Sequence, residues 1–109
     1  MHTKDTPIEN FGFPVTLAFS KKGKFYFSER ITGRLWEANL NFRNKKQESS
    51  QKARLIITLP VVPLVGHNET GLLGIALDPK FESNGFIYCY YTHGTSEKNF
   101  KNRVVRVKK

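Results

Sequence analysis

The sequence of 109 residues has one cysteine, one methionine and one tryptophan. The single cysteine, Cys89, excludes a disulfide within the chain and leaves the redox compartment open, because a chain with one cysteine functions inside or outside the cytosol. The segment from Met1 to Pro14 has no apolar run long enough for a signal peptide. No stretch approaches the length of a membrane span. As written, the chain is therefore expected to be soluble and not exported by the usual route.

Acidic residues are scarce: 9 Asp and Glu stand against 18 Lys and Arg, which gives a formal net charge of +9. Such a balance is compatible with nucleic acid, an anionic membrane surface or an acidic partner. The cations are scattered over residues 21–24, 43–54 and 98–109, a distribution that favours solvated turns and strand edges blunted by lysine. Nucleic-acid binding is not expected, because the chain has no aromatic-basic platform or groove-reading motif.

The 3.6-residue period of a surface helix is missing from every segment longer than one or two turns. Short apolar and aromatic runs alternate instead with glycine and proline turns, which is the pattern of an antiparallel meander. Pro79 and Asn84-Gly85 indicate a turn at residues 78–84, where Asp78 accepts local backbone bonds. We predict an entry segment at 1–13, a flexible polar loop at 41–52, and strands at 15–20, 25–30, 34–40, 55–59, 71–77, 86–92 and 102–107.

The chain contains an internal repeat. Leu17-Ala18-Phe19, a turn and Gly23-Lys24-Phe25-Tyr26 match Ile75-Ala76-Leu77, a longer turn and Gly85-Phe86-Ile87-Tyr88, and each unit continues into a strand that opens with arginine and an apolar residue. The spacing exceeds the 40–50 residues usual for a propeller blade, and the polar loop accounts for the excess. The sequence thus predicts an all-β fold, a β-propeller fragment of about one blade plus the start of a second.

An incomplete propeller leaves surfaces uncovered. Propellers typically close with 4–8 blades, whereas an unclosed pair exposes a blade face and an edge strand. The chain is therefore expected to belong to a longer protein, or to assemble with other chains or with itself. No domain other than this partial propeller, residues 14–109, is expected.

The second unit resembles the signature of the soluble quinoprotein glucose/sorbosone dehydrogenases, which depend on pyrroloquinoline quinone (PQQ). The resemblance covers residues 13–107. It implies a six-bladed propeller that binds PQQ and calcium on its axis, an extracytoplasmic location, and oxidation of an aldose at its C1 hydroxyl by hydride transfer to the quinone, with a histidine as base. The residues that carry the resemblance are Glu69–Phe81 and Asn84–Tyr88, with Leu17–Phe19, Gly23, Ser28–Arg30 and Gly33–Leu35 similar to the family's first blade.

Only one position of the family's quinone pocket has a counterpart here, Glu69, where the family has Gln or Glu. From the residues alone, Glu69 is either a pocket-lining carboxylate or an exposed loop carboxylate. The catalytic histidine, the cofactor-binding Arg and Lys residues and the calcium ligands have no counterparts in this chain. We therefore assign no catalytic residue and no metal ligand, and we expect neither PQQ nor calcium to bind the chain alone.

Other reactive side chains are expected to be structural. His67 and Glu69 form a pair that is compatible with proton transfer, but two groups are too few for a metal site, and a loop histidine is favoured. Cys89 is expected to be a buried thiol that shares a strand face with Ile87 and Tyr91. Glu29-Arg30 is expected to make an ion pair or a turn contact. His2 and His93 receive no role.

Two functions from different classes remain open. The first is the N-terminal fragment of a PQQ-dependent aldose or sorbosone dehydrogenase-like oxidoreductase, which is not expected to be active by itself. The second is a non-catalytic interaction module of the propeller type, because the fold alone does not determine function.

Overall fold

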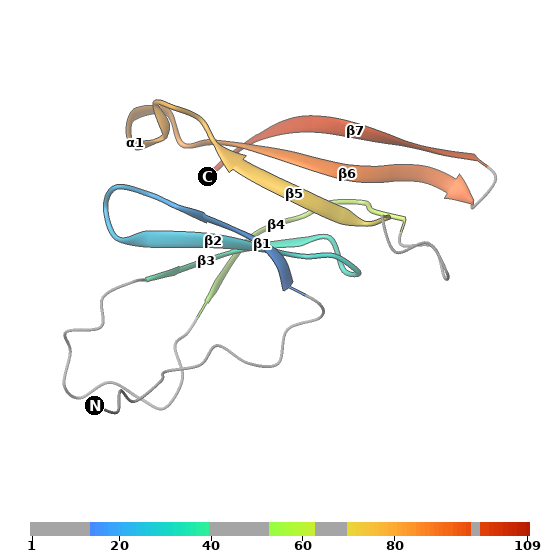
Figure 1. The fold of residues 1–109 in the computed structure, drawn as a ribbon, viewed down its shortest axis with the longest axis horizontal. Helices are drawn as coiled ribbons and strands as arrows, with labels where there is room; N and C mark the ends of the chain where they lie inside the picture. Colours follow the sequence, from blue (N-terminus) through green and yellow to red (C-terminus); the bar gives the residue numbers. More distant parts are fainter. Residues whose placement is uncertain (1–13, 40–52, 63–69, 97–98) are drawn as a thin grey trace.

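The computed structural model describes residues 14–39, 53–62, 70–96 and 99–109. These residues form two antiparallel sheets that lie one on the other (Figure 1). Sheet A contains, in spatial order, β1 (Pro14–Phe19), β2 (Lys24–Glu29), β3 (Arg34–Asn39) and β4 (Arg54–Thr58). Sheet B contains β5 (Leu72–Leu77), β6 (Phe86–Ser96) and β7 (Asn99–Lys108), and the short helix α1 (Phe81–Asn84) connects its first two strands. The predicted entry segment and the whole of the predicted polar loop lie outside the described residues.

The internal repeat is visible in the strand register. Ala18 of β1 pairs with Tyr26 of β2, and Ala76 of β5 pairs with Tyr88 of β6. The first hairpin of each unit also contains a glycine with positive φ. The φ angle is 81° at Gly23 and 70° at Gly85. The two sheets are therefore copies of one meander, and the second copy is described as far as its third strand.

The strands lie where the sequence predicts them, with one extension. We predicted that β6 ends at residue 92 and that β7 begins at residue 102, but the two strands pair further, with His93 opposite Lys101 and Gly94 opposite Phe100. This part of the hairpin is polar and lacks the apolar alternation that reveals a strand. Backbone pairing extends the ladder there, and the Asn99 side chain donates a hydrogen bond to the Thr95 hydroxyl (3.2 Å) near its end.

The predicted turn at 78–84 contains one turn of helix, α1, which the sequence analysis did not expect. The Asp78 carboxylate organises it by accepting hydrogen bonds from the Lys80 amide (2.8 Å), the Asn84 side chain (3.1 Å) and the Tyr88 hydroxyl (2.7 Å). The bond from Tyr88 is the main reason that the Asp78 pKa is lowered, followed by the bond from Lys80. The expected turn chemistry of Asp78 is confirmed, and the helical turn buries the Phe81 side chain.

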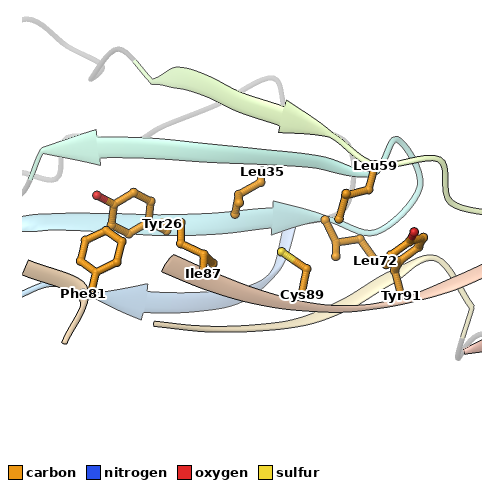
Figure 2. Packing of buried hydrophobic residues seen from close by; sticks show 8 residues of the cluster. All are labelled: Tyr26, Leu35, Leu59, Leu72, Phe81, Ile87, Cys89 and Tyr91. Atoms are coloured by element: carbon orange, nitrogen blue, oxygen red, sulfur yellow. The ribbon is translucent and has the colours of Figure 1, made fainter. Parts of the chain in front are cut away.

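The hydrophobic core lies between the two sheets (Figure 2). Burial of each large apolar side chain contributes about 1.5–3 kcal/mol, so this layer is what holds sheet B on sheet A. Cys89 is fully buried in it, as predicted, and burial raises its thiol pKa to about 11. The cluster comprises Tyr26, Leu35, Leu59, Leu72, Phe81, Ile87, Cys89 and Tyr91.

The face of sheet A that points away from sheet B is also apolar. Side chains alternate between the two faces of a strand, so the residues next to the core positions Tyr26 and Leu35 point outward. Leu17, Phe27, Trp36 and Leu55 face this way in register across all four strands. Leu17 is 58% exposed and Leu55 is 43% exposed. We call this surface the outer face of sheet A; its other members are Val15, Phe19 and Phe25.

A charged cluster fastens sheet B to sheet A at one end of the layer. The Glu37 carboxylate of β3 is nearly buried and accepts hydrogen bonds from the Tyr26 hydroxyl (2.7 Å) and the Arg54 guanidinium (3.1 Å), and it forms an ion pair with Lys109 after β7 (2.8 Å). Burial opposes ionisation of Glu37, but the bonds from Lys109, Tyr26 and Arg54 outweigh it and lower its pKa to about 2. Burial, with the bond to Glu37, raises the pKa of Tyr26.

No helix among residues 14–39, 53–62, 70–96 and 99–109 has the length and hydropathy needed to cross a membrane.

The Glu37 cluster predicts acid sensitivity. Because the folded-state pKa is about 2 and the ordinary value is 4.5, the contribution of the carboxylate is complete above pH 4.5 and is lost as the pH falls towards 2. Glu37→Gln is expected to remove about 2–3 kcal/mol of this pH-dependent free energy of unfolding, measured by urea unfolding between pH 7 and pH 2. Glu82→Gln, at an exposed position, is the control. An unchanged pH slope in Glu37→Gln would contradict the assignment.

Candidate functional site

The candidate site is defined by the chain around the family-like motif. Glu69, the predicted cofactor residue, and His67 lie outside the described residues, and so does His2. The described chain resumes at Thr70, which is bonded directly to Glu69 in the sequence. The contacts of Thr70 and the next two residues therefore define what the structure shows of this region.

Four residues join the sheets at this point: Arg30, which follows β2, Thr70 and Gly71, which precede β5, and Thr92 of β6. We call them the junction cluster. The Arg30 guanidinium donates to the Thr70 carbonyl (2.9 Å), and the Arg30 carbonyl accepts from the Leu72 amide (3.0 Å). From the other side, the Thr92 hydroxyl accepts from the Gly71 amide (3.1 Å), and the Thr92 amide donates to the Gly71 carbonyl (2.9 Å). The backbone is thus held from both sheets.

Glycine is required at position 71 for two reasons. Its φ is +110°, a conformation that residues with a Cβ rarely adopt. A Cβ built on it would also lie 2.2 Å from the Arg30 carbonyl oxygen, far inside contact distance. Gly71, the third residue of the family-like motif, therefore lets the start of β5 approach the end of β2.

The junction cluster is polar but well satisfied. Thr70 and Thr92 are buried, and the Thr92 hydroxyl donates to the Asn102 side chain (2.8 Å), which in turn donates to the Tyr90 hydroxyl (3.0 Å). Buried polar groups that find partners rigidify the structure around them. These groups act here as hydrogen-bond donors and acceptors, so the cluster holds a backbone in place.

Glu29-Arg30 was predicted to form an ion pair or a turn contact. The structure confirms the turn contact: the buried Glu29 carboxylate accepts from the Thr32 hydroxyl, and the Glu29 carbonyl accepts from the Gly33 amide (3.2 Å). Arg30 does more than the sequence indicated, since its side chain reaches the segment 40 positions away. The only sequence signal for this contact is Gly71, directly before an apolar strand. Nothing in the sequence indicates that Arg30 is its partner.

The other described candidates do not gather into a second centre. His93 of β6 contacts the Tyr91 ring edge-on, with ring centroids 6.3 Å apart. Within the described part of the chain, no three His, Cys, Asp or Glu side chains are close enough to hold a metal ion. A hollow of about 310 Å³ lies at the opposite end of β2 from the junction cluster, between Lys22, Lys24 and the helix α1.

The described residues therefore do not form a complete cofactor site. At the junction cluster the single cation is Arg30, among the residues described there, and its guanidinium is bound to the Thr70 carbonyl. An anionic quinone with calcium requires further charged groups. Such groups would have to come from other parts of the protein.

The chain is similar to a known protein family and to two solved structures. The family model described as Glucose / Sorbosone dehydrogenase matches residues 11–109. The PQQ-bound aldose sugar dehydrogenase of Streptomyces coelicolor has a TM-score of 0.71 and 26% identity, and the match covers 94% of this chain and 26% of that one. An oxidoreductase of Thermus thermophilus, described as a glucose dehydrogenase, has a TM-score of 0.68 and 28% identity, covering 95% of this chain and 26% of that one.

A curated relative adds a shorter match. An uncharacterized protein of Synechocystis sp. is 41% identical over 51 residues, which are 47% of this chain and 12% of that protein. The chain thus spans about a quarter of the two solved structures and a smaller share of the curated relative. The likeness to the solved dehydrogenases confirms the predicted fold, a β-propeller fragment.

Glycine substitution tests the close approach. Gly71→Ala combines an unfavourable φ with a clash against main chain and is expected to cost about 3 kcal/mol in free energy of unfolding. Gly23→Ala is a matched control, because φ is +81° there but no atom lies within 4 Å of an added Cβ. It is expected to cost about 1 kcal/mol. Equal losses for the two variants in chemical denaturation would show that the approach of Arg30 to Gly71 is not tight.

Proposed function

Since the chain belongs to the glucose/sorbosone dehydrogenase family, we propose that it forms the first blades of a PQQ-dependent oxidoreductase that acts on an aldose or sorbosone. The observation that carries the proposal is the family match over residues 11–109, made by a chain whose two sheets repeat one meander. The solved relative from Streptomyces coelicolor is a PQQ-bound aldose sugar dehydrogenase, which supports the choice of cofactor and substrate class.

In this proposal Glu69 lines the quinone site, and calcium, the catalytic histidine and the remaining cofactor-binding residues come from the rest of a six-bladed propeller. When bound, PQQ supplies the hydride acceptor. The contribution of this chain is positional: the junction cluster holds Thr70 and Gly71 between the two sheets by hydrogen bonds at 2.9–3.1 Å. The 109 residues alone are proposed to be inactive and to bind neither PQQ nor calcium.

The outer face of sheet A supports the need for further blades. Leu17 and Phe19 are 58% and 59% exposed, and the rings of Phe19, Phe25 and Phe27 follow one another at 6.0 and 5.9 Å. Phe27 is itself buried, and the exposed apolar side chains of this face are Val15, Leu17, Phe19 and Leu55. Exposed apolar side chains gathered on one face mark interaction surfaces. We propose that another blade of the same propeller covers it, from the same chain or from a partner chain.

The activity test uses the protein expressed from its own gene to its natural ends. With PQQ, calcium and an artificial electron acceptor, it is expected to oxidise aldoses, and the isolated 109-residue chain is not. Glu69→Ala is expected to lower kcat/KM at least about tenfold, in line with loss of one positioned polar group. Glu82→Ala, an exposed acidic residue on α1, is the control. A Glu69→Ala enzyme with unchanged kcat/KM would remove Glu69 from the site, and an inactive wild type would remove the enzyme proposal.

The second candidate is a non-catalytic interaction module, which the outer face of sheet A also favours. If the 109-residue chain folds by itself, sedimentation velocity is expected to show association, and Leu17→Glu is expected to abolish it by placing a charge on the apolar face. The control is Lys22→Glu, in an exposed turn. Thr16→Glu, at an adjacent position on the opposite face, is not suitable, because the Thr16 hydroxyl forms a hydrogen bond with Ser28 (2.8 Å). Association that survives Leu17→Glu would contradict this use of the face.

A further inference from the structure

We propose that the hollow between helix α1 and the turn from β1 to β2 binds a phosphate group, either as the free ion or as part of a small organic phosphate. The hollow lies at the opposite end of β2 from the junction cluster. The inference therefore concerns a second site and does not rest on the proposed dehydrogenase function.

The hollow is built at the seam between the two sheets. Sheet A contributes residues of the turn before β2 and the start of that strand, and sheet B contributes α1 and the residue after β7. The rings of Tyr26 and Phe81, which both line the hollow, pack edge-on with centroids 5.2 Å apart (Figure 2). The volume of about 310 Å³ is at the lower end of the range for small-molecule sites. A small ligand therefore fits between the sheets at this end.

Positive charge predominates in the lining of the hollow. Lys22, Lys24 and Lys109 line it, and Glu82 is the one acidic residue among its described lining residues. Lys109 is already paired with Glu37 (2.8 Å). The Glu82 carboxylate is engaged too, because it accepts a bond from a backbone amide of the turn before β2 (3.2 Å). The two lysines at the start of β2 thus leave an excess of positive charge, which favours an anionic ligand.

Donors at the hollow keep hydrogen-bonding capacity. The Ser20 hydroxyl accepts from the backbone amides of Lys22 (3.3 Å) and Lys24 (3.2 Å), so its own proton is left to donate. An ammonium group has three donors, and that of Lys24 uses one of them on the Asn39 side chain (3.1 Å). Within the described residues, the Lys22 ammonium has no hydrogen-bond partner. These groups are therefore able to bind an acceptor.

A phosphate group matches these donors better than a carboxylate does. It offers at least three strong acceptor oxygens and carries close to two negative charges near neutral pH, whereas a carboxylate has two oxygens and one charge. Lysine commonly binds phosphate as a point charge. Because Lys22 precedes β2 and Lys109 follows β7, a phosphate bound here contacts both sheets. Its binding is expected to raise Tm, because a ligand of the folded state stabilises that state.

The test measures the Kd for inorganic phosphate and for glycerol 3-phosphate by isothermal titration calorimetry, on the protein expressed from its own gene, in a phosphate-free buffer of low ionic strength. Lys22→Gln is expected to raise Kd about fivefold, as for an exposed charge contact. Lys22→Gln combined with Lys24→Gln is expected to raise it further. Lys101→Gln is the matched control, because it removes the same charge about 27 Å along β7 from Lys109, and it should leave Kd unchanged.

The outcomes are decisive for the hollow. Equal increases in Kd for Lys22→Gln and Lys101→Gln would show diffuse attraction to a basic protein and would overturn the inference. Absence of binding by both probes, or no effect of the double variant, would also overturn it. Tighter binding of glycerol 3-phosphate supports the site and identifies a phosphate ester as its ligand, and tighter binding of inorganic phosphate supports the site and identifies the free ion. Aldose oxidation is not a readout, so failure here leaves the proposed function standing.

Discussion

The close approach of Gly71 to the Arg30 carbonyl is the constraint on which the two-sheet unit depends. It sets where β5 begins, because Leu72, the first residue of that strand, donates its amide to the same carbonyl. Leu72 is fully buried in the core between the sheets, and it pairs with Tyr91 of β6. A side chain at position 71 would push the strand away and with it one end of the hydrophobic core.

The layer between the sheets is fastened differently at its two ends. At the junction cluster the bonds are made by backbone groups, the Thr92 hydroxyl and the Arg30 guanidinium. At the other end a single carboxylate, Glu37, collects donors from both sheets and stays charged although it is nearly buried. Between these ends the contact is apolar and contains the Cys89 thiol. Apolar burial supplies the strength of the contact, while the polar groups at the ends determine how the two sheets are aligned.

The sequence predicted the strands, the repeat and the fold because these depend on neighbours along the chain. Apolar alternation and glycine turns locate β1, β2 and β3, and the pairing of Ala18 with Tyr26 repeats at Ala76 with Tyr88. The end of the β6–β7 hairpin was missed because its residues carry no apolar pattern, and α1 was taken for a turn because it is one turn long. The assignment of Glu69 to a cofactor site stays a prediction.

Contacts between distant segments were beyond the sequence. Arg30 meets Thr70 across 40 positions, and the carboxylate of Glu37 meets Arg54 across 17 positions. A glycine or a glutamate in one sequence signals that a special environment is required, but not which residue provides it. The junction cluster therefore became visible only when the two sheets were placed together.

The order of the strands in sheet A indicates which connections between strands can change in length and which cannot. β1 lies beside β5 of sheet B, whereas β3 and β4 are the two strands of sheet A that lie farthest from β1 in the strand order. Insertions or deletions between these two strands change the length of the repeat without altering how one sheet meets the next. A duplicated ancestral meander would thus accumulate differences in length at its outer rim, while the inner strands keep the spacing on which neighbouring units depend.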